Sequence, residues 1–458
     1  RVWAVLSMPS ITALMCLRGR QSFQASWLSR LMRTLIVNSG ELAHLCLGDV
    51  REPLTGDDMS DRSNNIYPPG QGILIERGII VQITDSQSLI AEYAPGWDGQ
   101  RDISAELSVV DAGGRAIVPG FVDSHTHLLW GGDRSSEMRL RQSGLTYRQI
   151  AELGGGIAKT VASTRSMSIE DLLSVGMSRL DYASSLGTTS MEVKSGYGLS
   201  VESELRLLEA VDELSRHTRV NLFPTWLGGH DFPSDCTRSE YLDQLISEQL
   251  PSVMEQGIAL WADVFCEPGW FSTDETEAIV LASKELGLPA RLHVDEFEDS
   301  GGLALAADIG AVSADHVAKS GLDARKAASD SGTMQTFLPG TPYVMGASLD
   351  LPVQTCMEEE WAFSLATDFN PNCRILSIPF IGNLASNRMG MDPLAALVSV
   401  TRNPATTLRG SDVSGTLAVG SRADLNILWS ESVDGWCQTP GENPISHSII
   451  DGIIVNSS

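Results

Sequence analysis

The sequence predicts an α/β fold: a parallel (β/α)8 barrel of the TIM type, with a small β-sandwich domain made from both chain ends. From Ala116 onward, short apolar runs alternate with amphipathic helical patterns. Before Ala116 and after Leu408, the chain instead carries short β-like runs separated by turns. Together these patterns indicate a barrel whose two flanking segments meet in a second, smaller domain.

The barrel region contains eight candidate strands. They are residues 116–122, 188–193, 220–226, 261–266, 290–294, 311–315, 333–338 and 361–367. Helical patterns lie between them over residues 169–186, 201–217, 241–256, 273–286 and 322–331, and the last long helix is predicted over 392–408. Strands that alternate with helices in this way are expected to be parallel and to close into a barrel.

The flanking segments each contain a predicted hairpin. One is Gly72–Val81, with its turn at Arg77-Gly78, and the other spans residues 448–455, with its turn at Asp451-Gly452. We therefore expect residues 33–115, read as all-β, to join residues 410–458 in the composite sandwich. Residues 116–409 are expected to form the barrel.

Residues 1–32 differ from the rest of the chain. They are rich in Arg and Ser, and no acidic residue precedes Glu41. This composition is typical of an extension that is either disordered or an organelle transit peptide. Without such a peptide, a cytoplasmic location is expected.

Composition and charge narrow the class of protein. The chain has 458 residues, of which 42% are hydrophobic and 20% charged, as in soluble globular proteins. Its net charge of −26 argues against nucleic-acid and anionic-membrane partners, and an anionic substrate would need a local cationic pocket. The seven cysteines are scattered and form no CxxC, which predicts free thiols.

Most of the histidines follow predicted strands. Of eight in the chain, five do so: His125, His127, His230, His293 and His316. Asp368 follows the eighth strand. Because active sites of such barrels lie at the C-terminal ends of the strands, we expect these side chains to converge.

His125, His127, His293 and Asp368 form a mixed nitrogen and oxygen set that suits one divalent ion, Zn²⁺ or Fe²⁺. A bound ion of this kind lowers the pKa of a coordinated water toward about 7. Glu296, three residues after His293, is the candidate to carry the water proton to a leaving nitrogen. Asp295 is its nearest competitor.

The motifs around these residues resemble the imidazolonepropionase family of the amidohydrolase superfamily, over roughly residues 33–455. The superfamily shares the Pro-Gly-x-x-Asp-x-His-x-His segment at 119–127. More specific are the segments at 153–157 (LGGGI), 192–199 (EVKSGYGL), 228–230 (GGH), 263–267 (DVFCE), 293–297 (HVDEF), 314–316 (ADH) and 367–372 (TDFNPN).

This resemblance implies a cyclic amidase of histidine degradation. The reaction would open 4-imidazolone-5-propanoate to N-formimidoyl-L-glutamate, with Glu296 and Asp368 as the catalytic groups. The implied ligands of the metal are His125, His127, His293 and Asp368. The implied substrate contacts are Arg134, for the carboxylate, and Tyr147, Tyr197, His230, Glu296, His316, Asn370 and Asn372. Homodimers are common among such enzymes, although the sequence leaves the oligomeric state open.

Two further expectations concern the loop after Asp368 and the role of His230. The segment Asn370-Pro371-Asn372-Cys373-Arg374 departs from many bacterial members of the family, which leaves the roles of Cys373 and Arg374 open. His230 is assigned as a donor that stabilises the developing oxyanion.

Three alternatives remain open at this point. The first is another amidohydrolase chemistry, such as deamination of a purine or pyrimidine or hydrolysis of another cyclic amide. The second is a two-metal hydrolase in which Lys194 is carbamylated and bridges the ions. The third is a non-catalytic metal-binding or scaffolding protein.

Overall fold

The computed structural model describes residues 33–99, 102–104, 106–408 and 415–457. The predictions made for residues 1–32 lie outside these ranges. Within them, no helix has both the length and the apolar character needed to cross a membrane. The described cysteines, Cys46, Cys236, Cys266, Cys356, Cys373 and Cys437, are free thiols, as predicted.

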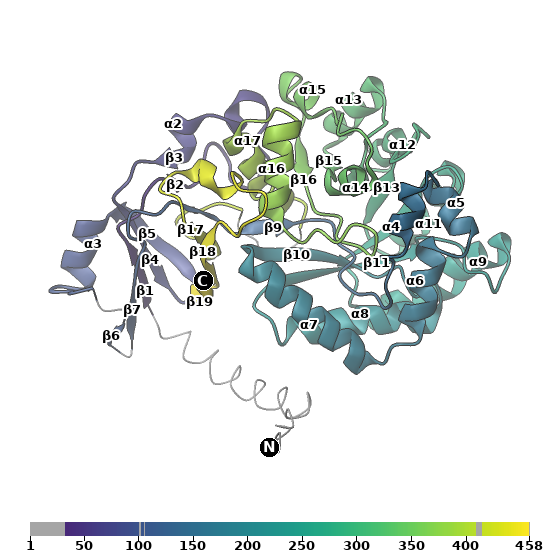
Figure 1. Ribbon diagram of the computed structural model, residues 1–458, viewed down its shortest axis with the longest axis horizontal. Helices are drawn as coiled ribbons and strands as arrows, with labels where there is room; N and C mark the ends of the chain where they lie inside the picture. Colours follow the sequence, from purple (N-terminus) through teal and green to yellow (C-terminus); the bar gives the residue numbers. More distant parts are fainter. Residues whose placement is uncertain (1–32, 100–101, 105, 409–414, 458) are drawn as a thin grey trace, which may run out of the picture.

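Eight strands form one parallel sheet in the order in which they follow along the chain, which confirms the predicted barrel (Figure 1). They are β9 (Phe121–Asp123), β10 (Thr188–Lys194), β11 (Asn221–Gly229), β12 (Trp261–Cys266), β13 (Ala290–Val294), β14 (Ser313–His316), β15 (Met334–Phe337) and β16 (Phe363–Leu365). β10, β12, β13, β14, β15 and β16 are buried along their whole length, as expected for a sheet covered on both faces.

Helices surround this sheet. Those of the outer layer are α7 (Ile169–Ser185), α8 (Val201–Ser215), α9 (Arg238–Gln244), the π-helical turn η2 (Leu245–Gln249), α10 (Leu250–Gln256), α11 (Thr273–Glu285), α12 (Gly302–Asp308), α13 (Leu322–Ser331), α15 (Val353–Glu358), α16 (Ile378–Arg388), α17 (Pro393–Ser399) and α18 (Arg402–Ala405). Four further helices follow barrel strands in the chain: α4 (Glu137–Gln142), α5 (Tyr147–Glu152) and α6 (Gly156–Arg165) after β9, and α14 (Gly340–Met345) after β15. Polar caps fix several starts. Ser200 caps α8, and reciprocal capping boxes begin α7, α9 and α11.

The barrel closes between its first and last strands. Thr126 forms a parallel bridge with Phe369, and the amide N–H of Asp368 donates to the carbonyl of His125 over 3.1 Å. A second contact joins the same two segments: the buried carboxylate of Asp123 accepts hydrogen bonds from the amide and the hydroxyl of Thr367 at 3.0 and 2.6 Å. This closure therefore brings the two histidines that follow β9 beside the aspartate that follows β16.

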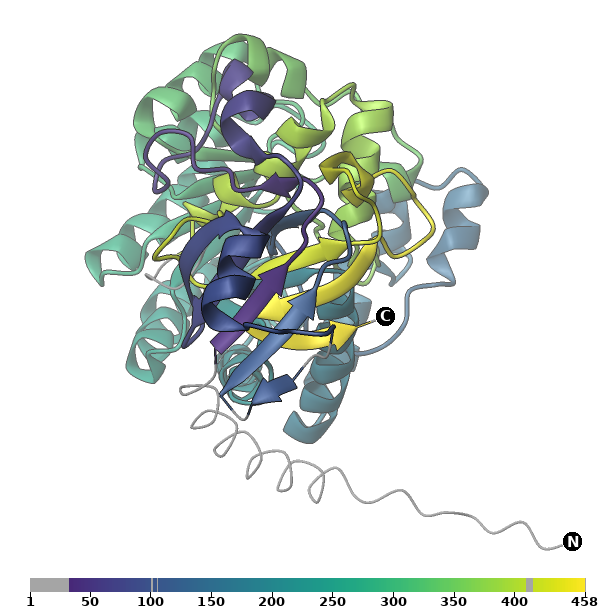
Figure 2. The same cartoon turned by 90° about the vertical axis from the view of Figure 1, so that its left-hand side faces the viewer.

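Two further sheets form the sandwich. The five-stranded sheet runs β5 (Ile79–Asp85), β4 (Gln71–Glu76), β1 (Arg33–Val37), β7 (Leu107–Asp111), β6 (Asp102–Ser104). The six-stranded sheet runs β19 (Ile453–Ser457), β18 (Ile445–Ile450), β17 (Leu425–Leu428), β8 (Ile117–Pro119), β2 (Leu42–Ala43), β3 (Ile66–Tyr67). Strands of the C-terminal end, yellow in Figure 2, thus lie beside strands from the N-terminal half. The composite origin of the sandwich is confirmed.

An apolar core joins the two sheets. Ile36 and Ile73 of the five-stranded sheet pack in one cluster with Ile117, Leu425 and Ile449 of the six-stranded sheet. Both predicted hairpins are present, with positive φ angles at both residues of each turn, as type I′ turns require. The all-β reading of residues 33–115 was wrong in part. The region also contains α3 (Ser86–Tyr93), α2 (Arg62–Asn65) and the 3₁₀ turn η1 (Gly56–Met59).

The strand predicted over residues 116–122 is two strands, β8 and β9. At Gly120 the chain leaves β17 of the sandwich and joins β10 of the barrel. A Cβ at Gly120 would lie 2.3 Å from the hydroxyl of Thr189, so only glycine fits this crossing.

The helix predicted over 392–408 is also interrupted. It divides into α17 and α18 because Pro404 has no N–H to donate to the carbonyl of Val400. That carbonyl instead accepts from the amide of Val122 in β9 at 2.9 Å. The interruption thus anchors the first barrel strand.

Trp436, the last residue of the turn η3 (Val433–Trp436), connects the C-terminal segment to the barrel. The buried Trp436 packs against Phe121 and Gly382, and its indole N–H donates to the carbonyl of Pro393. We expect Trp436→Ala to lower the free energy of unfolding by about 3–5 kcal/mol, measured by urea denaturation. The exposed Trp429→Ala is the control and should cost no more than about 1 kcal/mol.

Candidate metal centre and substrate cavity

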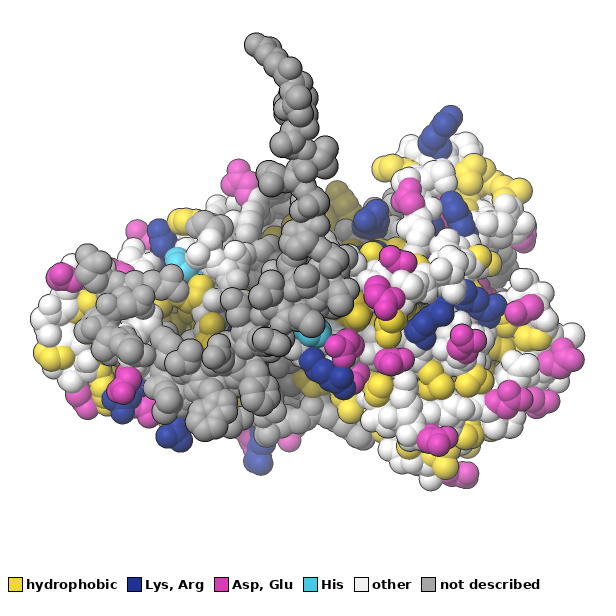
Figure 3. Space-filling model, turned by 90° about the horizontal axis from the view of Figure 1, so that it is seen from below, with side chains coloured by type: hydrophobic (Ala, Val, Ile, Leu, Met, Phe, Trp, Pro, Cys, Tyr) yellow, Lys and Arg dark blue, Asp and Glu magenta, His cyan; other side chains and the backbone are white. Residues whose placement is uncertain are grey.

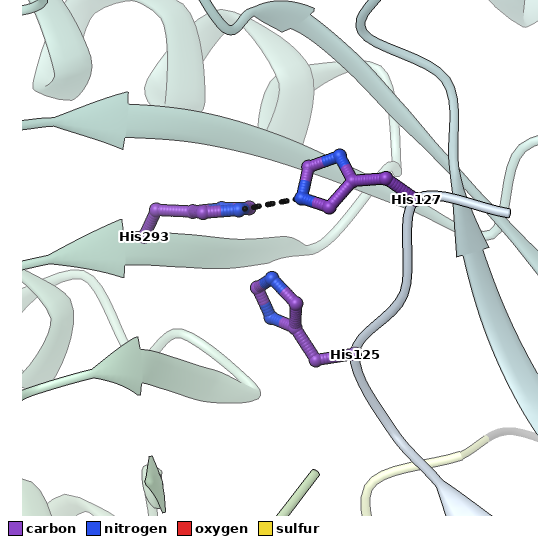
Figure 4. A group of neighbouring side chains, drawn as sticks. All are labelled: His125, His127 and His293. Atoms are coloured by element: carbon purple, nitrogen blue, oxygen red, sulfur yellow. Dashed lines mark hydrogen bonds between the residues drawn. The ribbon is translucent and has the colours of Figure 1, made fainter. Parts of the chain in front are cut away.

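Three histidine rings converge at the C-terminal end of the barrel. His125 and His127 follow β9, and His293 lies within β13 (Figure 4). The Nε2 atoms of His127 and His293 are 3.3 Å apart. Oδ1 of Asp368 lies 3.7 Å from Nε2 of His125 and 3.6 Å from Nε2 of His127. The four side chains that the sequence singled out are therefore brought together.

These spacings fit a single ion. Four ligands at about 2.0–2.1 Å from a tetrahedral centre lie about 3.3–3.4 Å from one another. Nε2 of His125 and Oδ1 of Asp368 are buried and accept no hydrogen bond from any described residue. Buried polar atoms without hydrogen bonds are costly, and a shared cation removes that cost. The set fits a divalent metal ion.

Burial keeps the imidazoles of His125 and His127 neutral. It lowers the pKa of His125 and of His127 well below the ordinary value, and neighbouring cationic and imidazole groups add to the shift. Burial also raises the pKa of Asp368 to about 6. Neutral imidazole is the form that ligates metals, so His125 and His127 are already in the state that binding requires.

Two buried carboxylates orient the histidines. Oδ2 of Asp315 lies 2.7 Å from Nδ1 of His125, and Oδ2 of Asp263 lies 2.9 Å from Nδ1 of His293. Since a carboxylate accepts, Nδ1 of His125 carries the proton and its Nε2 presents the lone pair. This is the tautomer that a metal at the convergence point needs. Asp263 lies beside Nδ1 of His293 as an ion-pair contact without a hydrogen bond between these two atoms.

One ammonium group holds both carboxylates. Nζ of the buried Lys194 lies 2.8 Å from Asp263, 2.9 Å from Glu192 and 3.8 Å from Asp315. Burial alone would lower the pKa of Lys194, but the three carboxylates outweigh it and raise that pKa. Carbamylation requires a neutral amine, so these ion pairs argue against the two-metal alternative in which Lys194 bridges the ions.

A cavity of about 480 Å³ opens beside the cluster. Of the predicted substrate contacts, those whose side chains are described all line it. They are Arg134, Tyr197, His230, Glu296, His316, Asn370 and Asn372. Tyr147 begins α5, but its side chain lies outside the described part of the structure.

Glu296 occupies the wall of this cavity. Its Oε2 lies 3.7 Å from Nε2 of His316, and burial together with the nearby Asp368 raises its pKa well above the usual value. Glu267 fixes the Glu296 loop, because its carboxylate accepts from the amides of Glu296, Phe297 and Glu298. Asp295 instead accepts from the amides of residues 300, 302 and 303, so it is structural and does not compete.

The geometry of His230 contradicts the donor role predicted for it. Nδ1 lies 2.9 Å from the carbonyl oxygen of Gly196, which can only accept, so Nδ1 carries the proton. Burial lowers the pKa of His230 to about 3, so the ring is neutral. Its Nε2 is therefore an acceptor and cannot donate a hydrogen bond to an oxyanion.

The loop after Asp368 is held by its own asparagine. Oδ1 of Asn370 accepts from the amides of Asn372 and Cys373, and Nδ2 donates to the carbonyl of Asp368. The Cys373 thiol is buried, and burial raises its pKa, so it is not a reactive thiolate. Arg374 is exposed, and its guanidinium lies 3.9 Å from Asp133.

Several functional neighbours were missed from the sequence. The hydroxyl of Thr341, after β15, donates to Oδ2 of Asp368, and Phe265, Phe297 and Met345 line the cavity. Asp263 and Asp315 stood in motifs without an assigned role. Their position inside apolar strands was a usable signal, because a carboxylate buried in a strand needs a partner.

Comparison with known proteins places the chain in a family. The model of the amidohydrolase family matches residues 108–168. The imidazolonepropionase of Symbiobacterium thermophilum is 38% identical, with 86% of this chain and 90% of the relative covered. The corresponding protein of Haloarcula marismortui is 35% identical, covering 89% and 94%. This chain belongs to the imidazolonepropionase family.

Solved structures agree on the fold of this family member. A 5-methylcytosine deaminase from Klebsiella pneumoniae superposes with a TM-score of 0.65 at 17% identity, covering 93% of this chain and 98% of the other. An atrazine chlorohydrolase from Arthrobacter aurescens gives a TM-score of 0.67 at 13% identity, covering 93% and 95%. At such low identity they establish the barrel and sandwich architecture alone.

The Lys194 network predicts a defect in metal binding. Lys194→Met leaves Asp263, Glu192 and Asp315 without their shared cation, so the orientation of His125 and His293 should loosen. We expect the affinity for Zn²⁺ to fall by about 10- to 100-fold in competition with a chelator. The exposed Lys326→Met, which breaks only a surface ion pair, should bind the ion as the unmodified chain does. Equal affinities for all three proteins would exclude the role of Lys194.

Proposed function

We propose that this chain opens the ring of 4-imidazolone-5-propanoate to give N-formimidoyl-L-glutamate, the ring-opening step of histidine degradation. The observation that carries the proposal is the placement of Arg134 and Glu296 in one cavity with His127, His293 and Asp368, three of the four converging ligands. A cyclic amide that bears a carboxylate tail matches this combination of groups. The family membership supports the same reaction.

We further propose that His125, His127, His293 and Asp368 bind one ion per chain, Zn²⁺ or Fe²⁺. When bound, such an ion polarises a carbonyl group and lowers the pKa of a coordinated water. The other side chains of the cavity bind and orient the substrate. Arg134 binds the propanoate tail, Tyr197 packs beside it, and His230 accepts from a ring N–H, as its tautomer requires.

In the reaction, water adds its oxygen to the ring carbonyl carbon, and the bond from that carbon to the ring nitrogen breaks. Glu296 takes a proton from the water and delivers it to the departing nitrogen. The second proton is lost to solvent, because the product is a carboxylate at neutral pH. Asp368 is the second candidate to move a proton, and His316 faces Glu296 across the cavity.

The partner in this proposal is a small anion. On the described part of the face in Figure 3, acidic and basic side chains are interspersed, and the chain as a whole carries a net charge of −26. Both features favour recognition by a single side chain such as Arg134 over recognition by an extended basic surface. The proposed assembly is a homodimer.

Hydrolysis of 4-imidazolone-5-propanoate by the purified chain is the direct test. Loss of the imidazolone absorbance should be seen, with about one metal ion per chain on the same sample. Turnover of neutral purines or pyrimidines without turnover of the imidazolone would replace this proposal with a deaminase. A metal content near two ions per chain would revive the dinuclear alternative.

The proton-carrier role predicts a defect in kcat for Glu296→Gln. The amide keeps the shape of the side chain but cannot carry the proton, so kcat should fall by about 10²- to 10⁴-fold with metal content unchanged. Glu298→Gln, two residues along on the exposed side of the same loop, is the control and should keep its activity. If kcat survives in Glu296→Gln, the proton passes through another group, and Asp368 becomes the first candidate.

A further inference from the structure

Arg134 does not stand alone in the cavity wall. Its guanidinium is buried and meets the buried carboxylate of Glu137, the first residue of α4, through a fork of hydrogen bonds. Nε lies 3.0 Å from both carboxylate oxygens, and Nη2 lies 2.8 Å from Oε2. The edge of the guanidinium formed by Nε and Nη2 is therefore turned toward Glu137.

The same carboxylate also binds the backbone of a glycine turn. Oε1 of Glu137 accepts from the amide of Gly156, the first residue of α6, at 3.0 Å. A Cβ at Gly155 would lie 2.9 Å from this oxygen, and Gly154 and Gly156 have φ angles of +84° and +66°. The run of three glycines is thus explained by close approach at one position and by left-handed backbone at the other two.

This arrangement connects the arginine to the cavity wall on a second side. Ile157, which follows the glycine turn, lines the cavity together with Arg134. At the other end of α6, the hydroxyl of Thr164 accepts from the amide of Gly131, in the segment that follows the histidine pair. α6 is therefore tied at both ends to the stretch of chain that carries Arg134.

The charge of the pair matters as much as its geometry. A buried guanidinium and a buried carboxylate at this distance are neutral together, so Arg134 does not attract an anion through net charge. Recognition must then depend on where its N–H groups point. A planar guanidinium whose Nε–Nη2 edge faces Glu137 can meet a second carboxylate only along the edge that carries Nη1.

We propose that Glu137 is a specificity-determining positioning residue: it fixes which edge of Arg134 faces the cavity and so selects ligands with a carboxylate tail that reaches that edge. The inference rests on the proposed function, because the tail in question is the propanoate of the imidazolone. Glu137 touches no reacting atom. Its effect is exerted through Arg134 and through the turn at residues 154–156.

The test compares two substrates and two kinds of variant. Glu137→Gln replaces an acceptor by an NH₂ group that opposes Nη2, and Glu137→Asp keeps the charge but shortens the reach. For 4-imidazolone-5-propanoate, Glu137→Gln should raise KM by about 10- to 100-fold with kcat within about threefold, and Glu137→Asp should recover part of the loss. For the imidazolone ring without its propanoate, kcat/KM should be the same in the unmodified chain and in Glu137→Gln.

Controls separate this role from a structural one. Glu152→Gln, at an exposed acid at the end of the neighbouring helix α5, should leave both substrates unaffected. A loss of kcat/KM in Glu137→Gln that is equal for the tailed and the tail-less ring would overturn the proposal, as would an unchanged KM for the tailed ring. Glu137→Asp provides the same comparison if Glu137→Gln does not fold.

Binding of imidazole propanoate distinguishes failure of the inference from failure of the proposed function. This ligand has the tail but no carbonyl to hydrolyse, and calorimetry measures its affinity without turnover. If the unmodified chain does not hydrolyse the imidazolone, but the affinity for the tailed ligand falls about 10- to 100-fold in both Arg134→Ala and Glu137→Gln, the reaction is wrong and the positioning role stands. If Arg134→Ala loses affinity and Glu137→Gln does not, the positioning role is wrong.

Discussion

The site depends on the closure of the barrel between β9 and β16. The carboxylate of Asp123 accepts hydrogen bonds from Thr367, and three residues further along the chain Thr126 forms a β-bridge with Phe369. Asp368, which follows the last strand of the barrel, comes within 3.7 Å of histidines that follow the first. Residues separated by most of the chain therefore share one ligand cluster only because the sheet is a closed ring.

Around that cluster the structure buries an unusual density of charge. Lys194, Glu192, Asp263 and Asp315 are fully buried, and each has at least one partner of opposite charge or an imidazole within reach. Such a network adds little net stability, because the desolvation of each charge offsets most of the attraction. The network instead fixes the positions of the side chains around the ligand cluster. The hydrogen bond from His125 to Asp315 also decides which nitrogen of His125 is available to a cation.

Much of this architecture was predictable from the sequence, because periodic patterns report local structure faithfully. The eight strands, the hairpins at Arg77-Gly78 and Asp451-Gly452, and the convergence of the histidines all followed from period and position. Breaks caused by tertiary contacts were not predictable. The division at Gly120 depends on Thr189, a contact without a local signature. The interruption between α17 and α18 is marked in the sequence by Pro404, and only the contact of the Val400 carbonyl with Val122 lay beyond the sequence.

The tautomer of His230 was also beyond the sequence, since it is set by a carbonyl more than thirty residues away at Gly196. The same limit applies to Glu137. Its spacing from Arg134 is that of an ordinary helical ion pair, and only its second bond, to Gly156, shows that it belongs to the cavity wall. Side chains that act through a partner thus leave weaker marks in a sequence than side chains that act directly.

One continuous segment forms both β8 of the sandwich and β9 of the barrel, and it connects the two domains directly. β17 holds β8 at Pro119, and four residues after Pro119 the chain reaches Asp123 at the base of the ligand cluster. Strands near the C-terminus are therefore coupled, through a few peptide bonds, to His125 and His127. Because this one segment belongs to both domains, neither domain can be cut out of the chain without severing a strand of the other.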